Sequence, residues 1–533
     1  AGYINDKLIY ENVKGHNIVR DAYKIKFLNY DAANKFNSLK QLEAFMGSLI
    51  KETDVPFDLE RPMTVEEENE VIKYCVHDVK ELIKVFDKTK NNFTSQVSLI
   101  EMFDEDISMI SKTSAQLTAS ILSAQKLEGM NDEYDFKYPD TLKLDKYQFV
   151  KEWFDSIKEG KVDTSGKVEF TTNIANVETV YALGGVHGAI PNYHEEGILL
   201  SMDVASLYPA LVIEYGLMSR AVESVEKFKE IRDTRIKLKR EKNPLQAVLK
   251  LVINSVYGCF GDQYNPLCDK RMMRSVCVAG QLLLTDLIEK IEPYCQPFNI
   301  NTDGVFVKVE KEEDVEVITK IANEWEKRTR LELEFERFVK VIQKDVNNYI
   351  VVTPDGKSKA KGAFVKDLNE LDYDLPIVNK AVKEYFVSNT LVDETINNCN
   401  ELIEFQKIVK LTSVYDEGAW KDCTFSKQKV LNESTGKYST KNMWNGDGYR
   451  LKDKTFRVFA SNREEDGALF KKKSNKNPEK FPNTSEKVFI DNEEVLGKTV
   501  PEYLDKRWYI DLANDRIRQF LGIKKERKKK EKV

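Results

Sequence analysis

The sequence predicts an α+β protein of several domains, and three segments carry that prediction. One is an apolar run that ends at Asp203, and the second is a pair of helical patterns separated by Asn243-Pro244. The third is a pair of β-rich runs joined by a turn at Asp303-Gly304. At 533 residues the chain is long enough for several domains with cores of their own.

The first segment predicts a buried strand followed by a helix. The run from Gly197 to Met202 is apolar enough for a buried strand, and it places Asp203 at the strand's end. Ser206 precedes a second apolar stretch and is expected to cap the helix that begins there. An isolated aspartate at a strand end is usually a solvated turn residue, so this segment alone assigns no function.

The second segment predicts a helix with one polar face. Lys250, Asn254 and Tyr257 fall at positions i, i+4 and i+7, so they share one side of that helix. Gly258 is expected to end it, since glycine favours helix C-termini.

A preceding helix, 225–242, is predicted to pack against it as an antiparallel hairpin. Arg232, Arg235 and Lys239 lie along one face of this helix. Fixed cations on such a face suit the phosphates of a nucleotide. A solvent-exposed, charge-laced helical pair is the alternative reading of the same pattern.

The third segment predicts a tight hairpin that holds Asp303 at its tip. Asp203 and Asp303, brought together from two strand ends, offer the oxygen ligands that Mg²⁺ prefers. Two such ions about 3.5–4 Å apart stabilise the attacking and leaving oxygens of an in-line displacement. The sequence therefore points to metal-assisted phosphoryl or nucleotidyl transfer.

Together these segments resemble the three polymerase motifs of family B DNA polymerases, in particular those of bacteriophages. They occur in the family's order, and they read Asp-Val-Ala-Ser-Leu-Tyr-Pro from 203, Lys-Leu-Val-Ile-Asn-Ser-Val-Tyr-Gly from 250 and Thr-Asp-Gly from 302. The resemblance implies a right-hand fold of palm, fingers and thumb. It also implies that Asp203, Asp303 and the Val204 carbonyl bind two Mg²⁺ ions, with Mn²⁺ as an alternative.

The same resemblance assigns a nucleotide site. It implies that Lys250 contacts the incoming triphosphate together with Arg232 or Arg235. Tyr208 would lie under the sugar and exclude a 2′-hydroxyl. The full set of nucleotide-binding residues that it implies is Ser206, Leu207, Tyr208, Arg232, Arg235, Lys250, Asn254 and Tyr257, with Asp203, Asp303 and Lys250 as the catalytic residues.

Further elements resemble segments with which the family contacts DNA. Tyr-Ala-Leu-Gly-Gly from 181 is similar to the element that joins exonuclease and polymerase modules, although with one extra residue, and two elements after 348 resemble primer–template contacts. The DNA-binding residues implied are Tyr181, Gly184, Gly185, Gly258, Tyr349, Lys361 and Gly362. One departure is Asn301, where the family usually has aspartate; activity is expected to persist, with metal affinity or preference altered.

The N-terminal part resembles only the end of a proofreading exonuclease. Tyr74 and Asp78 lie one helical turn apart on a predicted helix, 66–87, as in the third motif of the family's 3′→5′ exonuclease. The two earlier exonuclease motifs are missing upstream of Tyr74. We therefore expect a partial ribonuclease H-like domain, and a chain that is the C-terminal part of a longer or split enzyme lacking the N-terminal part of its exonuclease.

The implied domains follow the motif order. They are the C-terminal part of the exonuclease (1–125), a linker (126–196), the first part of the palm (197–223), the fingers (224–262), the second part of the palm (263–370), the thumb (371–523) and a charged tail (524–533).

The expected function is template-directed extension of a nucleic-acid primer, with proofreading incomplete. The expected partners are a DNA primer–template, deoxynucleoside triphosphates and a separate N-terminal exonuclease fragment. The intervals 203–250 and 258–303 are too short for the insertions of protein-primed polymerases, so no priming protein is expected. Two alternatives stay open: a subunit of a split polymerase that needs an N-terminal partner, and an inactive polymerase-like DNA-binding module.

Composition agrees with a large enzyme that binds nucleic acid. The net charge of −6 is unevenly distributed along the chain. From residue 421 onward the chain has 28 Lys and Arg against 18 Asp and Glu. No apolar run is long enough to span a membrane. The seven cysteines include no Cys-x-x-Cys pair, which favours free thiols in an intracellular setting, that is, the cytoplasm of a phage-infected or host bacterium.

Overall fold

The structure is a computed structural model, and it divides into two compact units. It describes residues 7, 11, 13, 15–18, 27–32, 37–56, 59, 61–415, 417–420, 424–432, 437–445, 449–450, 454–473 and 476–523. One unit comprises 1–90 and 367–515, and the other comprises 91–366 and 516–533. The second unit contains the predicted fingers segment and the predicted palm segments up to residue 366. The domain boundaries expected from the sequence remain predictions.

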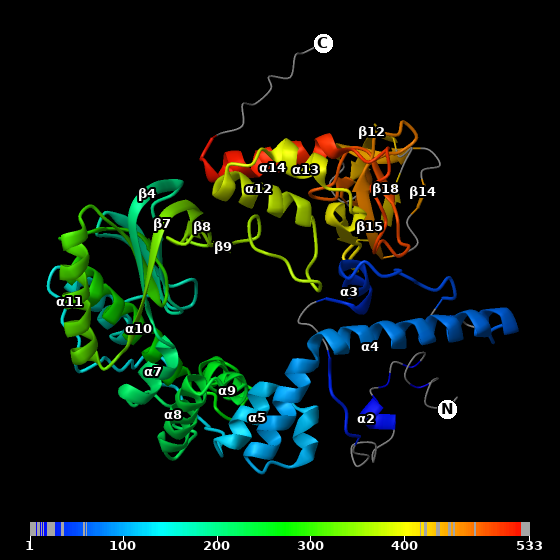
Figure 1. The fold of residues 1–533 in the computed structure, drawn as a ribbon. Helices are drawn as coiled ribbons and strands as arrows, with labels where there is room; N and C mark the ends of the chain where they lie inside the picture. The colour runs from blue at the N-terminus through cyan, green and yellow to red at the C-terminus, as the bar shows by residue number, and fades with distance from the viewer. Residues whose placement is uncertain are drawn as a thin grey trace. The chain divides into compact units, whose positions relative to one another are not determined.

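An antiparallel sheet is the framework of the second unit, with the strand order β1-β2-β3-β5-β6-β4-β7-β8-β9 among the described residues (Figure 1). Its strands are β1 (Glu169–Ile174), β2 (Val177–Ala182), β3 (Val186–Ala189), β4 (Tyr193–Val204), β5 (Gln296–Ile300), β6 (Gly304–Val309), β7 (Leu333–Asp345), β8 (Asn348–Val352) and β9 (Ser358–Lys361). Leu199, Phe298 and Phe338 pack together in its core. Burial alternates along β2, whereas the central strands β4 and β5 have runs of consecutive buried residues, because both of their faces are covered there.

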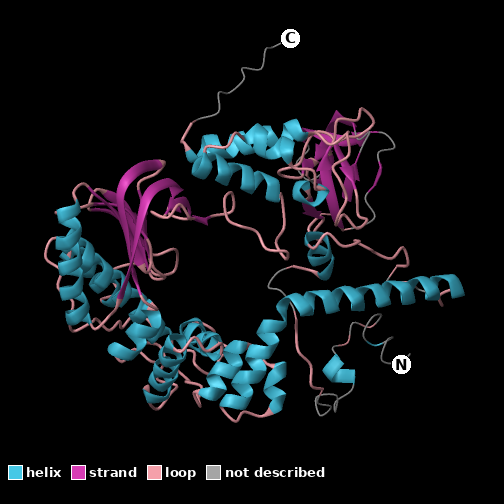
Figure 2. Cartoon of the chain, viewed as in Figure 1, coloured by secondary structure: helices cyan, strands magenta, loops and turns pink. Residues whose placement is uncertain are grey.

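Helices back this sheet and extend beyond it (Figure 2). They are η3 (Ile107–Ser111), α5 (Ser114–Ile121), α6 (Gln148–Lys158), α7 (Leu207–Glu214), α8 (Glu226–Arg240), α9 (Leu245–Phe260), α10 (Lys270–Ile291) and α11 (Glu312–Thr329). Both α10 and α11 contact β6, and α10 also contacts α7 and α9. The Asp269 side chain caps α10 by accepting from the Met272 N–H. Most of α10 is buried, so it forms the centre from which the site's helices are positioned.

The predicted strand, helical pair and hairpin are all present, with two local differences. Helix α9 does not end at Gly258; it continues to Phe260 because Cys259 and Phe260 are buried, and Gly261 follows. Ser206 does stand at the N-cap of α7, but its backbone is left-handed (φ 51°) and its side chain makes no capping hydrogen bond. The extension of α9 comes from tertiary packing, which local propensity does not register.

The first unit combines small sheets with helices. Its sheets are β10-β15-β18, β14-β11-β16-β17 and β12-β13. The strands are β10 (Lys407–Lys410), β11 (Glu417–Trp420), β12 (Thr424–Asn432), β13 (Lys437–Asn445), β14 (Tyr449–Arg450), β15 (Thr455–Ala460), β16 (Leu469–Lys472), β17 (Glu479–Lys480) and β18 (Val488–Ile490). The helices are α2 (Gly15–Ile18), α3 (Leu39–Phe45), α12 (Pro376–Ser388), α13 (Val392–Asn398) and η4 (Leu402–Phe405). The buried Arg457 guanidinium donates to the carbonyls of Ala44 and Ser48, which fixes α3 against β15.

Two long helices contribute residues to both units: α4 (Val65–Met102) and α14 (Lys506–Phe520). The helix predicted for 66–87 is therefore confirmed as part of α4, which continues for another four turns. Among the described residues, no helix combines the length and the apolar character that crossing a membrane requires.

Candidate active site

Asp203 and Asp303 meet where strand β4 ends beside the β5–β6 hairpin. In the β4–β6 ladder Asp203 lies opposite Gly304. The Val204 N–H donates to the Asp303 carbonyl at 2.7 Å, and the Asn301 N–H donates to the Gly304 carbonyl at 2.9 Å. The hairpin tip is thus held against the strand end that carries the first carboxylate.

Glycine at 304 is what allows this approach. A Cβ at that position would lie 2.8 Å from Cγ of Asp203 and 2.9 Å from the Met202 carbonyl oxygen. Real Cβ atoms essentially never come that close to other atoms. The Gly in the third motif is therefore explained by the closeness of the two strand ends.

The electrostatics around Asp203 favour a cation. Burial, followed by the negative charges of Asp303, Glu336 and Glu334, raises the pKa of Asp203 to about 6. The Ser201 hydroxyl donates to Asp203 Oδ2 at 3.1 Å and opposes that rise. A divalent cation at this point would relieve the repulsion between the carboxylates.

A pocket of about 250 Å³ opens beside the carboxylates. It is lined by Ser206, Leu207, Tyr208, Pro209, Ile253, Asn254, Tyr257, Thr302 and Asp303. Five residues predicted to bind nucleotide thus lie around one cavity with one predicted metal ligand. Sequence reasoning missed Pro209, Ile253 and Thr302 as lining residues, although each lies within one of the three motifs and could have been read from it.

Two tyrosines form one wall of this pocket. The rings of Tyr208 and Tyr257 lie 4.1 Å apart between centroids, tilted by 35°. The Tyr257 hydroxyl lies 2.7 Å from Cys277 Sγ on α10. Burial is the main cause that raises the pKa of both tyrosines, so both hydroxyls stay protonated at neutral pH. No sequence motif singled out Cys277, which is distant from the three motifs along the chain.

The predicted phosphate-binding cations lie outside the lining of this pocket. Lys250 is exposed on the same face of α9 as Asn254, as predicted. Arg232 is paired with Glu214 at 3.1 Å and with Asp233 at 2.8 Å. Arg235 Nε is buried without a hydrogen-bond partner among the described residues. Arg232 and Arg235 are therefore not among the residues that line the pocket with Asp303.

The loop between β2 and β3 approaches the site through its glycines. A Cβ at Gly185 would lie 2.9 Å from Thr302 Oγ1, so this loop fits closely against the hairpin tip. The Gly184 carbonyl accepts from Cys277 Sγ at 3.2 Å.

The assignment of Tyr181 as a DNA contact needs correction. Its side chain is 1% exposed, and its hydroxyl shares a 2.8 Å hydrogen bond with Thr285 on α10. A side chain enclosed in the core cannot reach a phosphodiester chain. Tyr181 instead supports the loop that carries the two glycines.

Of the remaining DNA-binding candidates, Tyr349 lies on β8, Lys361 ends β9 and Gly362 follows it. Tyr349 pairs with Lys361 across the ladder, and Lys361 Nζ lies 5.9 Å from the Tyr349 ring centroid. Burial, with smaller contributions from the charges of Asp203 and Asp303, raises the pKa of Tyr349 to about 12. Gly362 has φ +110°, and a Cβ there would lie 2.8 Å from Cγ of Asn348. Gly258 is exposed on α9, with nothing near its Cβ position.

The predicted exonuclease residues Tyr74 and Asp78 share a face of α4, and Lys40 lies beside both of them. Lys40 Nζ lies 2.6 Å from Asp78 Oδ1 and 4.8 Å from the Tyr74 ring centroid. Asp78 is therefore paired with a lysine in this structure, and its role in an exonuclease stays a prediction. We assign no exonuclease step to this pair.

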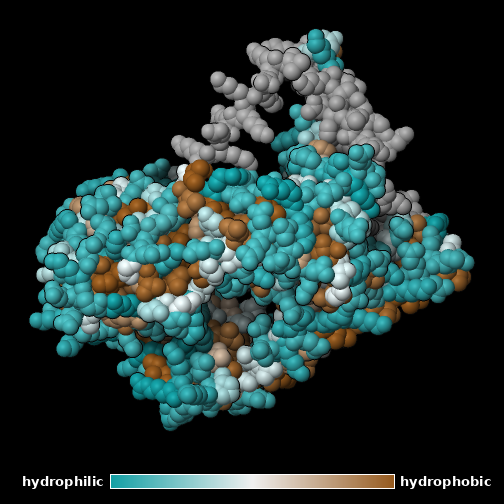
Figure 3. Space-filling model, turned by 45° about the horizontal axis from the view of Figure 1, so that its top comes forward, coloured by the Kyte–Doolittle hydropathy of each residue, from teal (hydrophilic) through white to brown (hydrophobic). Residues whose placement is uncertain are grey.

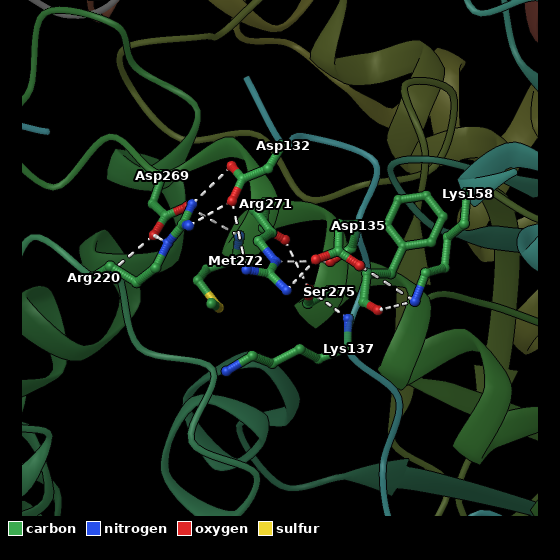
Figure 4. Close-up of polar contacts among 10 residues, drawn as sticks. Asp132, Asp135, Lys137, Lys158, Arg220, Asp269, Arg271, Met272 and Ser275 are labelled. Atoms are coloured by element: carbon green, nitrogen blue, oxygen red, sulfur yellow. Dashed lines mark hydrogen bonds and ion pairs between the residues drawn. The ribbon is translucent and has the colours of Figure 1, made fainter. Parts of the chain in front are cut away.

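An ion-pair network anchors the start of α10 (Figure 4). Arg220 bridges Asp132 and Asp269, with nitrogen–oxygen distances of 2.6 and 2.8 Å. Arg271 also contacts Asp132, at 3.5 Å, and is paired with Asp135. Because Cys277 follows on the same helix, this network indirectly fixes the base of the tyrosine wall.

Divalent cations fit the donor set at Asp203 and Asp303. The Asp203 and Asp303 carboxylates and the neighbouring backbone carbonyl of Val204 are hard oxygen ligands. Among the described residues no group of three or more His, Cys, Asp or Glu side chains is arranged to hold a metal. Such a cation would need further ligands from a substrate, as Mg²⁺ commonly takes from phosphates.

Comparison with known proteins gives two kinds of similarity. No family model matches the chain. The chain is 26% identical over 293 residues to DNA polymerase 1 of Saccharolobus solfataricus, covering 45% of this chain and 32% of that protein. It is 23% identical over 308 residues to DNA polymerase 1 of Sulfurisphaera ohwakuensis, covering 47% and 34%. The chain thus matches about a third of the length of these curated relatives.

Among solved structures, the family B DNA polymerase from the archaeon Pyrobaculum calidifontis aligns at 13% identity with a TM-score of 0.42. The alignment covers 93% of this chain and 62% of that one. These relatives are archaeal, and the expected bacteriophage type stays a prediction. Over nearly half its length, the chain is similar in sequence to archaeal DNA polymerases.

Proposed function

We propose that this chain is a DNA-directed DNA polymerase that extends a nucleic-acid primer by nucleotidyl transfer. One observation carries the proposal: Asp303, paired through the backbone with the Asp203 strand end, lines the same pocket as Tyr208, Asn254 and Tyr257. A pocket lined by one carboxylate and two aromatic rings, with a second carboxylate close to the first, suits a nucleotide triphosphate with bound cations. Sequence similarity to archaeal DNA polymerases supports the same proposal.

In this proposal the carboxylates of Asp203 and Asp303 and the Val204 carbonyl hold two Mg²⁺ ions, with Mn²⁺ as an alternative. When bound, these cations supply charge stabilisation for the attacking and leaving oxygens of an in-line displacement. The chain's own carboxylates orient the cation site. Ionised Asp203 is essential to it, because a protonated carboxyl offers a weaker ligand.

The pocket's other residues select and orient the nucleotide. Asn254 and Tyr257, one helical turn apart on α9, face the nascent base pair. Tyr208 lies under the sugar and leaves no room for a 2′-hydroxyl. Ser206 and Leu207 present the start of α7 to the phosphates, where its N-terminal N–H groups favour anions.

Cations from the α8–α9 pair meet the triphosphate. Lys250 is exposed and available. Arg232 reaches a phosphate by exchanging its contact with Glu214, an ion pair that is partly exposed and therefore weak. Arg235 is the second candidate for this contact. The DNA contacts proposed are Gly184, Gly185, Gly258, Tyr349, Lys361 and Gly362.

Primer extension tests the proposal directly. The chain is incubated with a labelled primer on a DNA template, Mg²⁺ and four deoxynucleoside triphosphates. A ladder of longer products is the expected result, and it would also show that Asn301 is tolerated. Tight primer–template binding without extension would instead indicate an inactive DNA-binding module.

An exposed face of α4 favours a second candidate, a subunit of a split polymerase. Four apolar side chains follow one side of this helix at spacings of four, three and four residues: Ile72, Val76, Val79 and Ile83, with exposed fractions of 48–59%. Apolar residues form a continuous edge along α4 in Figure 3. Such a row is typical of a surface that another protein covers. The occupant that we propose is a separate chain with an apolar sheet face, an N-terminal exonuclease fragment.

Mixing experiments test this second candidate. A candidate exonuclease fragment is added to the wild-type chain and to an Ile72→Asp/Val79→Asp variant, and complex formation is followed by analytical ultracentrifugation. The complex is expected with the wild type only. Lys73→Asp, exposed on the same helix beside the apolar row, is the matched control that should retain binding.

A further inference from the structure

The tyrosine wall of the pocket rests on one buried thiol. Cys277 is 2% exposed and lies on α10, behind the Tyr208–Tyr257 pair. Its Sγ is 2.7 Å from the Tyr257 hydroxyl and 3.2 Å from the Gly184 carbonyl oxygen. Helices α9 and α10 and the β2–β3 loop therefore converge on a single sulfur atom.

The number of protons available in this cluster determines which group donates in each hydrogen bond. A thiol has one proton, and Cys277 donates it to the Gly184 carbonyl, which can only accept. The Tyr257 hydroxyl must then donate to the sulfur. The Tyr208 hydroxyl also interacts with Cys277 and lies 3.5 Å from the same carbonyl. The hydroxyl end of each tyrosine side chain is therefore anchored. The centroids of the two tilted rings lie 4.1 Å apart.

Anchoring matters because the contacts at the hydroxyl oxygens restrict rotation of each tyrosine about its side-chain bonds. The two rings line the cavity together with Thr302 and Asp303. A ring that tilts would widen the pocket at the point where the sugar rests. We infer that Cys277 is a positioning residue that fixes the Tyr208–Tyr257 wall and thereby sets the discrimination between deoxyribo- and ribonucleoside triphosphates. This inference rests on the proposed function, because it assigns a nucleotide sugar to that wall.

Two replacements of Cys277 distinguish a hydrogen-bonding role of the thiol from a role in core packing alone. Cys277→Val keeps an apolar side chain of similar size but removes both hydrogen bonds. Cys277→Ser is smaller but restores a donor and an acceptor. Packing alone predicts that valine is the better replacement, whereas positioning by hydrogen bonds predicts serine.

The matched control is Cys295→Val. Cys295 is a free thiol of the same unit whose Sγ donates to the Ile291 carbonyl at 3.3 Å, and it does not line the pocket. Its replacement should leave nucleotide selection unchanged. Thermal unfolding of all three variants shows whether each one folds.

Single-nucleotide incorporation provides the first measurement. The ratio of kcat/KM for a deoxyribonucleotide to that for the matching ribonucleotide is expected to fall roughly 10-fold in Cys277→Val, mainly through a lower KM for the ribonucleotide. Cys277→Ser and Cys295→Val should keep the wild-type ratio. An unchanged ratio in Cys277→Val, or an equal loss in Cys277→Ser, would overturn the inference.

Equilibrium binding separates this inference from the proposed function. Binding of the two triphosphates, with Mg²⁺ or with Ca²⁺ as a non-reacting substitute, is followed through tyrosine fluorescence. If the wild-type chain extends no primer, the proposed function fails, and the ratio of the two Kd values decides the role of Cys277. Absence of any triphosphate binding to the wild type would overturn the inference as well.

Discussion

Gly304 lies directly opposite Asp203 in the β4–β6 ladder, and its lack of a side chain leaves the space that the Asp203 carboxylate occupies. Gly304→Ala is expected to reduce primer extension on the order of 100-fold, because a Cβ 2.8 Å from the carboxylate carbon must displace it. Steady-state extension rates measure this effect. Gly166→Ala, where nothing lies near the added methyl group, should retain wild-type rates.

Asp303→Asn should abolish extension and leave primer–template binding nearly intact. The amide has almost the same shape but carries no charge, so it is a much weaker ligand for a divalent cation. Extension assays and fluorescence anisotropy with a labelled primer–template measure the two properties separately. Retained extension would contradict the assignment of Asp303 as a metal ligand.

Tyr208→Ala should admit ribonucleotides. Removing the ring opens the wall formed with Tyr257, and ribonucleotide incorporation is expected to rise roughly 10-fold or more relative to deoxyribonucleotides. Competition between the two nucleotides on one template measures the ratio. Tyr264→Ala, an exposed tyrosine outside the pocket lining, is the control that should leave the ratio unchanged.

Glu43 should make the stability of its unit depend on pH. Burial, together with the charges of Asp78 and Glu81, raises its pKa to about 7, and the bond from Lys40 only partly opposes this. A carboxyl whose pKa is higher in the folded state than in the unfolded state favours folding below about pH 4.5, and that contribution is lost as the pH rises through 7.

Glu43→Gln is therefore expected to lose this pH dependence. Between pH 5 and 8, wild-type stability should fall relative to the variant by up to roughly 3 kcal/mol, an upper limit set by the pKa change. Urea unfolding at a series of pH values measures the difference. If the wild-type chain instead became more stable than the variant as the pH rises, the raised pKa of Glu43 in the folded state would be contradicted.

Arg457→Met should destabilise the same unit at every pH. The buried guanidinium donates to the carbonyls of Ala44 and Ser48 and to the Gln406 side chain, and methionine removes all three of these hydrogen bonds. A loss of about 3 kcal/mol or more is expected. Denaturant unfolding checks this, with the exposed Arg507→Met as the control.

The sequence by itself determined the local elements of the candidate site. The apolar run before Asp203, the 250–257 periodicity and the turn at Asp303 predicted a strand, a helix and a hairpin, and all three are present. These predictions succeeded because each depends on spacing within a single element, which hydrophobic periodicity reports directly. The motif residues Tyr208, Asn254 and Tyr257 also proved to surround one cavity.

Only the tertiary structure decided how side chains from different elements meet. Tyr181 was predicted at the DNA surface but is enclosed by α10, and Lys40 neutralises Asp78. Cys277 had no sequence signal, since its partners come from α9 and the β2–β3 loop. Local patterns fix which face of an element is buried, whereas packing between elements selects which residues share that buried space.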